Sequence, residues 1–232
     1  MSVWAIADTH LSFGARKPMD IFPGWQNHIP RLEKNWNVLV GAEDTVVIPG
    51  DVSWGMTEEQ AVPDLAFLDS LNGRKLILKG NHDYWWNSMK KLNEMKERHG
   101  LESISFLHNN SAICENIAVC GTRGWMPDAG DDDKVLRREA GRLRLSLESA
   151  KDSGAEPVVF LHYPPIYEDD VCREIFDVLL EYGIRRCFFG HLHDERTDRF
   201  RKIERSGITF SLVSADFLGF APRLIARDGE IF

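Results

Sequence analysis

Histidine, aspartate and asparagine side chains are concentrated in five short motifs of this 232-residue sequence. Imidazole nitrogens with carboxylate or amide oxygens, and no thiolate, suit Mn, Fe, Zn, Co or Ni, whereas calcium prefers an all-oxygen shell. The motifs hold enough such groups for a site that binds two metal ions. In chain order they are Asp8-Thr9-His10, Gly50-Asp51, Gly80-Asn81-His82-Asp83, His162-Tyr163-Pro164 and Gly190-His191-Leu192-His193.

Each motif comes directly after an apolar run of strand character. The runs cover residues 3–7, 45–48, 76–78, 158–161 and 187–189. In open α/β sheets, ligands bind in the crevice beyond the carboxyl ends of the strands. We therefore expect the five motifs to converge on one site, although nearly the whole chain separates the first from the last.

Two motifs carry potential ligands at a spacing of i, i+2. Asp8 precedes His10, and His191 precedes His193, by two residues. An extended backbone points alternate side chains to the same face. This spacing predicts that each pair presents its two ligand atoms to a shared centre.

The order of the motifs resembles that of the calcineurin-like metallophosphoesterase superfamily, and the resemblance spans residues 8–193. One short motif arises often by chance, but five in this order are specific. The resemblance implies a phosphate ester hydrolase with two divalent transition-metal ions (Mn, Fe, Zn, Co or Ni). It also implies the metal ligands: Asp8, His10 and His193 for one ion, Asn81, His162 and His191 for the other, and Asp51 as the bridge.

The same resemblance implies a mechanism. A hydroxide shared by the two metal ions would attack phosphorus in line, while both ions neutralise charge on the phosphoryl oxygens. His82 would lie over the substrate, where it would stabilise the transition state or protonate the leaving oxygen. Asp83 would orient and charge the His82 ring.

The pattern of elements predicts one domain over residues 1–232, of the α/β class. Alternating strands and helices, followed by clustered short strands, favour two packed mixed β-sheets flanked by helices. The resemblance implies the same four-layer α/β/β/α sandwich. Helices are expected near residues 32–40, 57–71, 87–98, 136–150 and 171–182, and further strands near 104–107, 117–120, 208–213 and 222–226. The Thr57–Gln60 segment resembles a capping box.

Charge and composition restrict the class of partner. The formal net charge of −8 argues against non-specific binding to duplex DNA, whose phosphates are neutralised mostly by Lys and Arg. No apolar stretch approaches the roughly 20 residues of a membrane span. The four cysteines lie in or near apolar runs and form no Cys-x-x-Cys pair, which indicates buried thiols in a reducing compartment. We expect a cytoplasmic protein without a membrane partner.

Where the resemblance ends, the substrate contacts stay open. Protein phosphatases of the superfamily continue Gly-Asp into x-x-Asp-Arg-Gly, but here Asp51 is followed by Val52-Ser53-Trp54-Gly55. Arg123, which follows the 117–120 strand, could bind substrate phosphate instead, and pairing with nearby acids is an equally good alternative.

Several tryptophans and one acidic run have two interpretations. Trp54 and Trp125, with Trp85 and Trp86, could stack on a nucleobase or another flat leaving group, or could pack loops onto the core. The aspartates at 131–133 could bind a cation, but the exposed amides of a first helical turn favour a helix-start role.

The sequence as a whole favours a hydrolase that cleaves a phosphomonoester or phosphodiester of a small molecule, such as a nucleotide. The alternatives are a nuclease and a non-catalytic metal-binding scaffold. The sequence leaves open the natural substrate, the preference for mono- or diester, the metal in the cell and the oligomeric state.

Overall fold

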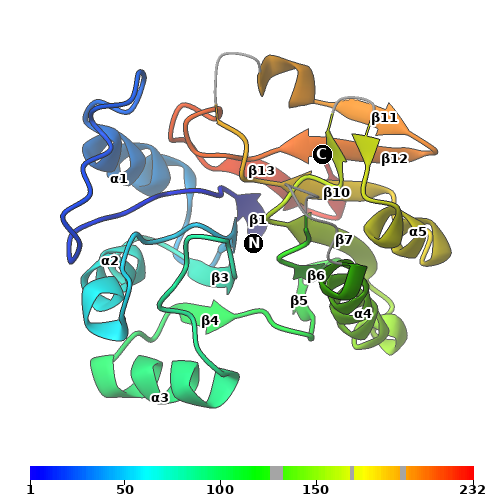
Figure 1. Cartoon of the computed structure of the whole chain (residues 1–232), viewed down its shortest axis with the longest axis horizontal. Helices are drawn as coiled ribbons and strands as arrows, with labels where there is room; N and C mark the ends of the chain where they lie inside the picture. The colour runs from blue at the N-terminus through cyan, green and yellow to red at the C-terminus, as the bar shows by residue number, and fades with distance from the viewer. Residues whose placement is uncertain (126–132, 168–169, 194–196) are drawn as a thin grey trace.

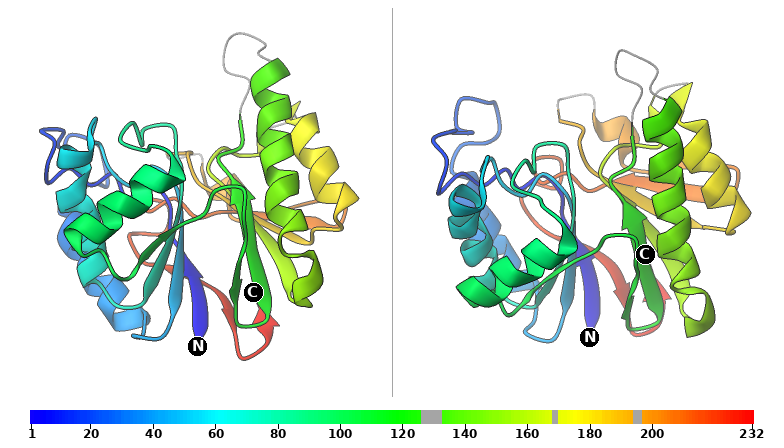
Figure 2. Two further views of the ribbon diagram at one scale, coloured as in Figure 1. Left: turned by 90° about the horizontal axis from the view of Figure 1, so that it is seen from below. Right: turned by 60° about the horizontal axis from the view of Figure 1, so that its bottom comes forward.

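The computed structural model describes residues 1–125, 133–167, 170–193 and 197–232, which form two six-stranded sheets and a two-stranded hairpin. Figure 1 shows helices on the outer sides of the two sheets, and Figure 2 shows the sheets facing one another. The sheet orders are β14-β13-β1-β2-β3-β4 and β11-β12-β10-β7-β6-β5. The expected aspartates at 131 and 132 lie outside the described residues.

The first sheet is built from parallel strands with an antiparallel extension. Its parallel part is β1 (Ser2–Ala5), β2 (Thr45–Pro49), β3 (Arg74–Leu78) and β4 (Ile104–Phe106), and its antiparallel edge is β13 (Arg223–Arg227) and β14 (Glu230–Ile231). Three helices pack on its outer face: α1 (His28–Leu39), α2 (Glu58–Ser70) and α3 (Met89–His99). Trp36 and Leu65 are fully buried in that layer.

The second sheet repeats the scheme. Its parallel strands are β6 (Ile117–Thr122), β7 (Glu156–Leu161), β10 (Arg186–Phe189) and β12 (Ile208–Leu212), with β5 (Ala112–Cys114) and β11 (Ile203–Arg205) antiparallel at the edges. Helices α4 (Asp133–Glu148) and α5 (Arg173–Glu181) cover its outer face. The remaining elements are β8 (Ile166–Tyr167), β9 (Asp170–Val171) and the 3-10 turns η1 (Lys151–Ser153) and η2 (Thr197–Phe200).

Besides the apolar contacts between each sheet and its helices, an apolar cluster lies between the two sheets and joins them into one sandwich. It contains Val3, Val47, Leu78, Val119 and Phe160 from strands of both sheets, all buried. Successive side chains along each strand therefore point alternately to the helices and to the opposite sheet, as expected for a β-strand. The four-layer α/β/β/α arrangement predicted from the sequence is confirmed.

The expected helices form, with two local differences. Helix α2 continues through Pro63, and Thr57 at its start makes no side-chain capping bond; Gln60 Oε1 instead accepts the backbone N–H of Met56 at 2.9 Å. The predicted capping box is therefore wrong, because the Gln60 side chain binds the N–H of the residue before Thr57 and not that of Thr57 itself. Helix α3, expected near residues 87–98, ends at Gly100, whose φ of 65° is the left-handed conformation that glycine favours.

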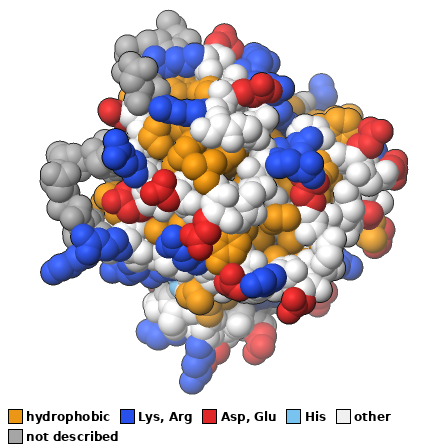
Figure 3. Space-filling model, turned by 90° about the vertical axis from the view of Figure 1, so that its right-hand side faces the viewer, with side chains coloured by type: hydrophobic (Ala, Val, Ile, Leu, Met, Phe, Trp, Pro, Cys, Tyr) orange, Lys and Arg blue, Asp and Glu red, His pale blue; other side chains and the backbone are white. Residues whose placement is uncertain are grey.

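The outer surface over α4 and α5 carries interspersed acidic and basic side chains around apolar ones (Figure 3). Within the described ranges, no helix combines the length and the apolar character that crossing a bilayer needs. All four cysteines are free thiols, and Cys120, Cys172 and Cys187 are buried. Burial raises the pKa of the Cys172 thiol to about 11.

Candidate metal centre

The two sheets meet at the edge where the motif residues lie. Ala7, just beyond β1, forms a parallel bridge with Ser214, just beyond β12, and the Ala7 N–H donates to Val213 O at 2.7 Å. This bridge places the carboxyl ends of strands from both sheets side by side. Two groups of candidate ligands form there: Asp8, His10 and His193 in one, and Asp51, His162 and His191 in the other. In each group the ligand atoms lie within 4.8 Å of one another.

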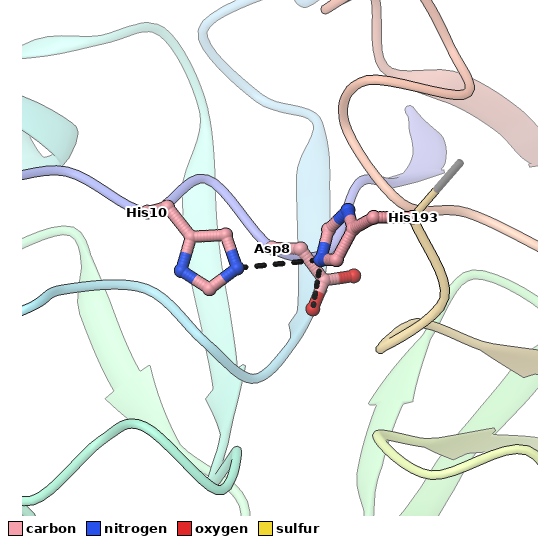
Figure 4. A group of neighbouring side chains, drawn as sticks. All are labelled: Asp8, His10 and His193. Carbon is pink, nitrogen blue, oxygen red and sulfur yellow. Dashed lines mark hydrogen bonds and ion pairs between the residues drawn. The ribbon is translucent and has the colours of Figure 1, made fainter. Parts of the chain in front are cut away.

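The first group combines two residues of the first motif, Asp8 and His10, with His193 of the last motif. In Figure 4, nitrogen atoms of His10 and His193 face each other, and the Asp8 carboxylate lies beside them. The two Nε2 atoms are 3.3 Å apart, and His193 Nε2 is 4.0 Å from Asp8 Oδ1. Asp8 is held by the Ser214 hydroxyl and the His191 N–H, which donate to its Oδ2 at 2.7 and 2.9 Å.

The second group is organised around His162, which is completely buried. Its Nδ1 lies 3.0 Å from Pro49 O, and since a carbonyl can only accept, Nδ1 carries the proton. The Nε2 of the neutral ring therefore presents a lone pair to the site. Asn81 Oδ1 lies 2.5 Å from this Nε2, so Asn81 joins the group by position.

Asp51, a member of the second group, also lies close to the first. Its Oδ2 is 3.9 Å from His10 Nε2 of the first group and 3.5 Å from His162 Nε2 of the second. Its Oδ1 accepts the backbone N–H of His82 at 2.8 Å. One carboxylate oxygen thus faces both candidate metal positions while the other is fixed by the neighbouring loop.

The backbone around these ligands is not extended. Asp8, His10, Asp51 and His191 have φ values of 58°, 43°, 51° and 72°, in the left-handed region that side chains other than glycine adopt rarely. The prediction that i, i+2 pairs share a centre is therefore wrong for His191 and His193, which belong to different groups. Asp8 and His10 do share a group, but through tight turns.

Glycine at two motif positions permits the close approach of the loops. A Cβ on Gly190 would come within 2.5 Å of Asp8 Oδ2, and a Cβ on Gly80 would overlap Asp51 Oδ1. Both contacts are shorter than van der Waals separation. The motif glycines are therefore needed so that backbone can pass directly beside the carboxylates.

The electrostatics of the cluster fit a cation. Burial raises the pKa of Asp8 to about 7 and, together with Asp83 and Asp8, that of Asp51 to about 9. Burial also lowers the pKa of His10 and His162, so these rings are neutral electron-pair donors. The buried Asp8 Oδ1 accepts no hydrogen bond from the described residues. Converging lone pairs of this kind repel one another unless a positive ion binds them.

His82 lies over the site but is not among the close donor groups. Its Nε2 is 4.0 Å from Asp51 Oδ2, and about a third of its side chain, 34%, is exposed. Its ring packs against Trp54 with centroids 4.4 Å apart, and Trp54 also stacks on His10 at 4.7 Å and 19°. Trp54 therefore fixes the orientation of two rings at the site.

Asp83 does not contact the His82 ring as predicted. Its Oδ2 accepts the backbone N–H of Asp51 and of Gly80 at 2.9 and 2.8 Å. Its Oδ1 accepts the backbone N–H of Val52 at 3.0 Å and the indole N–H of Trp85 at 3.1 Å. The carboxylate is buried beneath the loops. The predicted orienting role is therefore wrong, because all of its acceptor capacity is used to hold two ligand-bearing loops together.

Arg123 and Trp125 adopt the second of the two roles that the sequence left open. The Arg123 guanidinium lies 3.9 Å from Glu139 and 5.0 Å from the Trp125 ring centroid, which matches the alternative of pairing with an acid. Its backbone O accepts the N–H of His162 at 3.1 Å. Trp125 packs on the core, as do Trp85 and Trp86. Of the four tryptophans, Trp54 is the one found among the described residues that line the cavity at the site.

Sequence reasoning missed two residues that support the candidate ligands. Ser214 donates to Asp8, and Asp216 Oδ1 lies 2.9 Å from His193 Nδ1, so that Nε2 is left to face the metal position. Hydrogen bonds of this kind fix the tautomer and orientation of a histidine ligand. Both residues follow the predicted strand at 208–213, and the rule that polar groups gather at strand ends would have found them.

Comparison with known proteins agrees with this geometry. The family model for calcineurin-like phosphoesterase matches residues 1–195. The chain belongs to this family.

Curated relatives match parts of the chain. A Gene 66 protein of Mycobacterium phage L5 is 35% identical over 85 residues, which are 35% of this chain and 40% of that protein. A probable cyclic nucleotide phosphodiesterase of Coxiella burnetii is 26% identical over 179 residues, 71% of this chain and 66% of the relative. The matched part of the chain thus spans less than two thirds of the length of these relatives. The phosphopantetheinyl hydrolase of Mycobacterium tuberculosis shares the fold, with a TM-score of 0.60, 14% identity and coverage of 98% and 96%.

Proposed function

We propose that this enzyme hydrolyses a phosphomonoester or phosphodiester of a small molecule, with a nucleotide diester as the first candidate. The observation that carries the proposal is the position of Asp51 Oδ2, which faces both donor groups at 3.9 and 3.5 Å. Two cations in such sites lie roughly 3.5–4 Å apart, and a shared carboxylate offsets their repulsion. The similarity to the Coxiella burnetii relative supports a nucleotide diester.

The residues of the chain have separate tasks in this proposal. Asp8, His10 and His193 would hold one ion, Asn81, His162 and His191 the other, and Asp51 would bridge them. When bound, the two ions would supply Lewis acidity toward the phosphoryl group and an activated water. His82 would donate a hydrogen bond to a phosphoryl or leaving-group oxygen from above. Trp54 would hold the His82 ring in that place.

The test is turnover by protein stripped of metal and reloaded separately with Mn, Fe, Zn, Co or Ni. Substrates are p-nitrophenyl phosphate, bis(p-nitrophenyl) phosphate and a cyclic nucleotide, and Asp51→Asn is the control for the bridging position. We expect turnover that requires metal and is lost in Asp51→Asn. Metal binding without turnover of any ester would instead indicate the scaffold alternative.

The nuclease alternative is tested on the same metal-loaded protein. We expect no cleavage of single-stranded or duplex DNA in a gel assay, because the chain carries a net charge of −8 and phosphate neutralisation needs Lys and Arg. Cleavage at rates comparable with those on the small esters would contradict this choice. The cytoplasmic location stays a prediction, which the four free thiols support.

A further inference from the structure

A cavity of about 650 Å³ opens from the metal centre toward the loop of residues 19–25. Candidate ligands and His82 line it on one side. Its volume lies within the roughly 300–1,000 Å³ typical of small-molecule sites. The apolar part of its lining is Met19, Phe22, Pro23, Trp25, Trp54 and Phe217.

The apolar wall directly adjoins the first donor group. The Trp25 ring centroid lies 5.7 Å from that of His10 and 5.8 Å from that of His193. Trp54 stacks on His10, and its Nε1 lies 3.2 Å from Met19 Sδ. A phosphate held at the ligands would therefore place its organic substituent against these rings.

The charges in the cavity select against a second anionic group. Asp216 and Asp198, the latter paired with Arg201 at 3.0 Å, contribute carboxylates to the lining, and among the described lining residues none is Lys or Arg. Lys17 is nearby, but it is not one of those residues, and its ammonium lies 3.4 Å from the Trp54 ring centroid. A further phosphate or carboxylate on the substrate would meet like charge there.

We propose that this cavity binds the organic part of the substrate, and that this part is a flat or bulky apolar group without further negative charge. The proposal rests on the proposed function, since it needs the reacting phosphate to lie at the metal centre. It favours esters of aromatic or heteroaromatic compounds and disfavours polyphosphates and phosphorylated acids. Contact with the accessible aromatic rings supplies the affinity, and Phe22, at 48% exposure, offers a large apolar face.

The test uses phosphonates as competitive inhibitors of metal-loaded enzyme acting on bis(p-nitrophenyl) phosphate. A naphthylmethyl group adds a large apolar area to methylphosphonate, so we expect its Ki to be lower by roughly 10-fold or more. Propylphosphonate and 2-carboxyethylphosphonate have similar size but differ by one charge. We expect the carboxylate to bind several-fold more weakly than its neutral counterpart, at roughly the scale of an exposed like-charge contact.

Two phenylalanines give a matched pair of variants. Phe22 lines the cavity and is 48% exposed, whereas Phe13 is 50% exposed and packs on Phe67 away from the lining. Since both side chains are half exposed, Phe22→Ser and Phe13→Ser are expected to fold. The preference for naphthylmethylphosphonate over methylphosphonate should fall about threefold in Phe22→Ser, by the loss of part of one aromatic contact, and stay unchanged in Phe13→Ser.

A second readout needs no turnover. N-phenyl-1-naphthylamine is neutral and fluoresces in apolar surroundings, and we expect metal-free protein to bind one molecule, more weakly in Phe22→Ser than in Phe13→Ser. Turnover with equal Ki values for methyl- and naphthylmethylphosphonate would overturn the inference and leave the proposed function intact. Absence of all metal-dependent turnover, with the probe still bound, would overturn the proposed function but not the apolar binding site.

Discussion

The Asp83 carboxylate accepts the backbone N–H of Asp51 at 2.9 Å, so the loop after β3 holds the loop after β2. Asp83 is buried, and its other partners include the N–H groups of Gly80 and Val52. The backbone of Asp51, the candidate bridging ligand, has a positive φ and is thus held by the Asp83 carboxylate, which does not line the cavity. Asp83 is a positioning residue for Asp51.

Asp83→Asn should therefore destabilise the metal-free protein. An amide replaces one acceptor oxygen by an N–H₂ group, which leaves buried backbone donors facing another donor. We expect a loss of about 2–4 kcal/mol in the free energy of unfolding, measured by urea denaturation. Asp152→Asn, at an exposed position, is the control and should change stability little. A loss below about 0.5 kcal/mol in Asp83→Asn would contradict this role.

Asp216→Ala should weaken metal binding at the Asp8, His10 and His193 group. Loss of the carboxylate frees the His193 ring to rotate, and losing such a partner typically costs about 10- to 100-fold in affinity. Titration calorimetry with Mn measures the effect. Asp198→Ala removes the same charge from the same cavity, but Asp198 pairs with Arg201 at 3.0 Å, so its metal affinity should stay close to that of the unmodified protein. Equal losses in both variants would point to a general charge effect.

Two glycine-to-alanine changes should have opposite effects. In Gly190→Ala the new Cβ would meet Asp8 Oδ2 and Ala7, so the site should lose metal affinity and the fold should lose stability. In Gly141→Ala, on α4, the Cβ meets nothing within 4 Å, and helix propensity should stabilise the protein by about 0.5–1 kcal/mol. Thermal unfolding and Mn titration check both. Normal metal binding by Gly190→Ala would show that the loops are not closely packed.

Lys75 should make stability depend on pH in the alkaline range. Its ammonium is buried, donating to Asp69 O and Ser103 Oγ at 3.3 and 3.1 Å and to Leu71 O, and burial lowers its pKa from 10.5 to about 8. Between these values the unfolded chain binds more protons than the native protein, so the Lys75 contribution to stability rises with pH.

The measurement is the free energy of urea unfolding of three proteins between pH 8 and 10.5. The unmodified protein should gain up to about 1 kcal/mol per pH unit relative to Lys75→Met. Lys90→Met, at an 86% exposed position, should follow the unmodified protein. Parallel curves for the unmodified protein and Lys75→Met would mean that Lys75 keeps an ordinary pKa in the fold.

The fold and the identity of the candidate ligands could be predicted because both follow from repeated local patterns. Apolar runs ending in polar motifs indicate parallel strands that open on one crevice, and all seven predicted ligands lie there. The edge strands β5, β11 and β14 were not predicted from the sequence, because they are only two or three residues long and half exposed.

The turns that orient the ligands, the residue that supports them and the apolar wall of the cavity could not be predicted in the same way. The i, i+2 rule assumed extended backbone, but positive φ angles at Asp8, His10 and His191 turn the side chains individually. Asp83 belongs to a ligand motif by sequence, yet its partners are backbone amides brought near by folding. The apolar wall around Trp25 depends on a loop whose path no periodic pattern encodes.

Anomalous diffraction from crystals of Mn-loaded protein will show whether two adjacent ions share Asp51. We predict two Mn peaks roughly 3.5–4 Å apart with Asp51 Oδ2 bound to both. Ligands of one ion should be Asp8, His10 and His193, and those of the other Asn81, His162 and His191. A single ion at full Mn occupancy, or two ions with Asp51 bound to neither, would rule out a shared two-metal centre at Asp51.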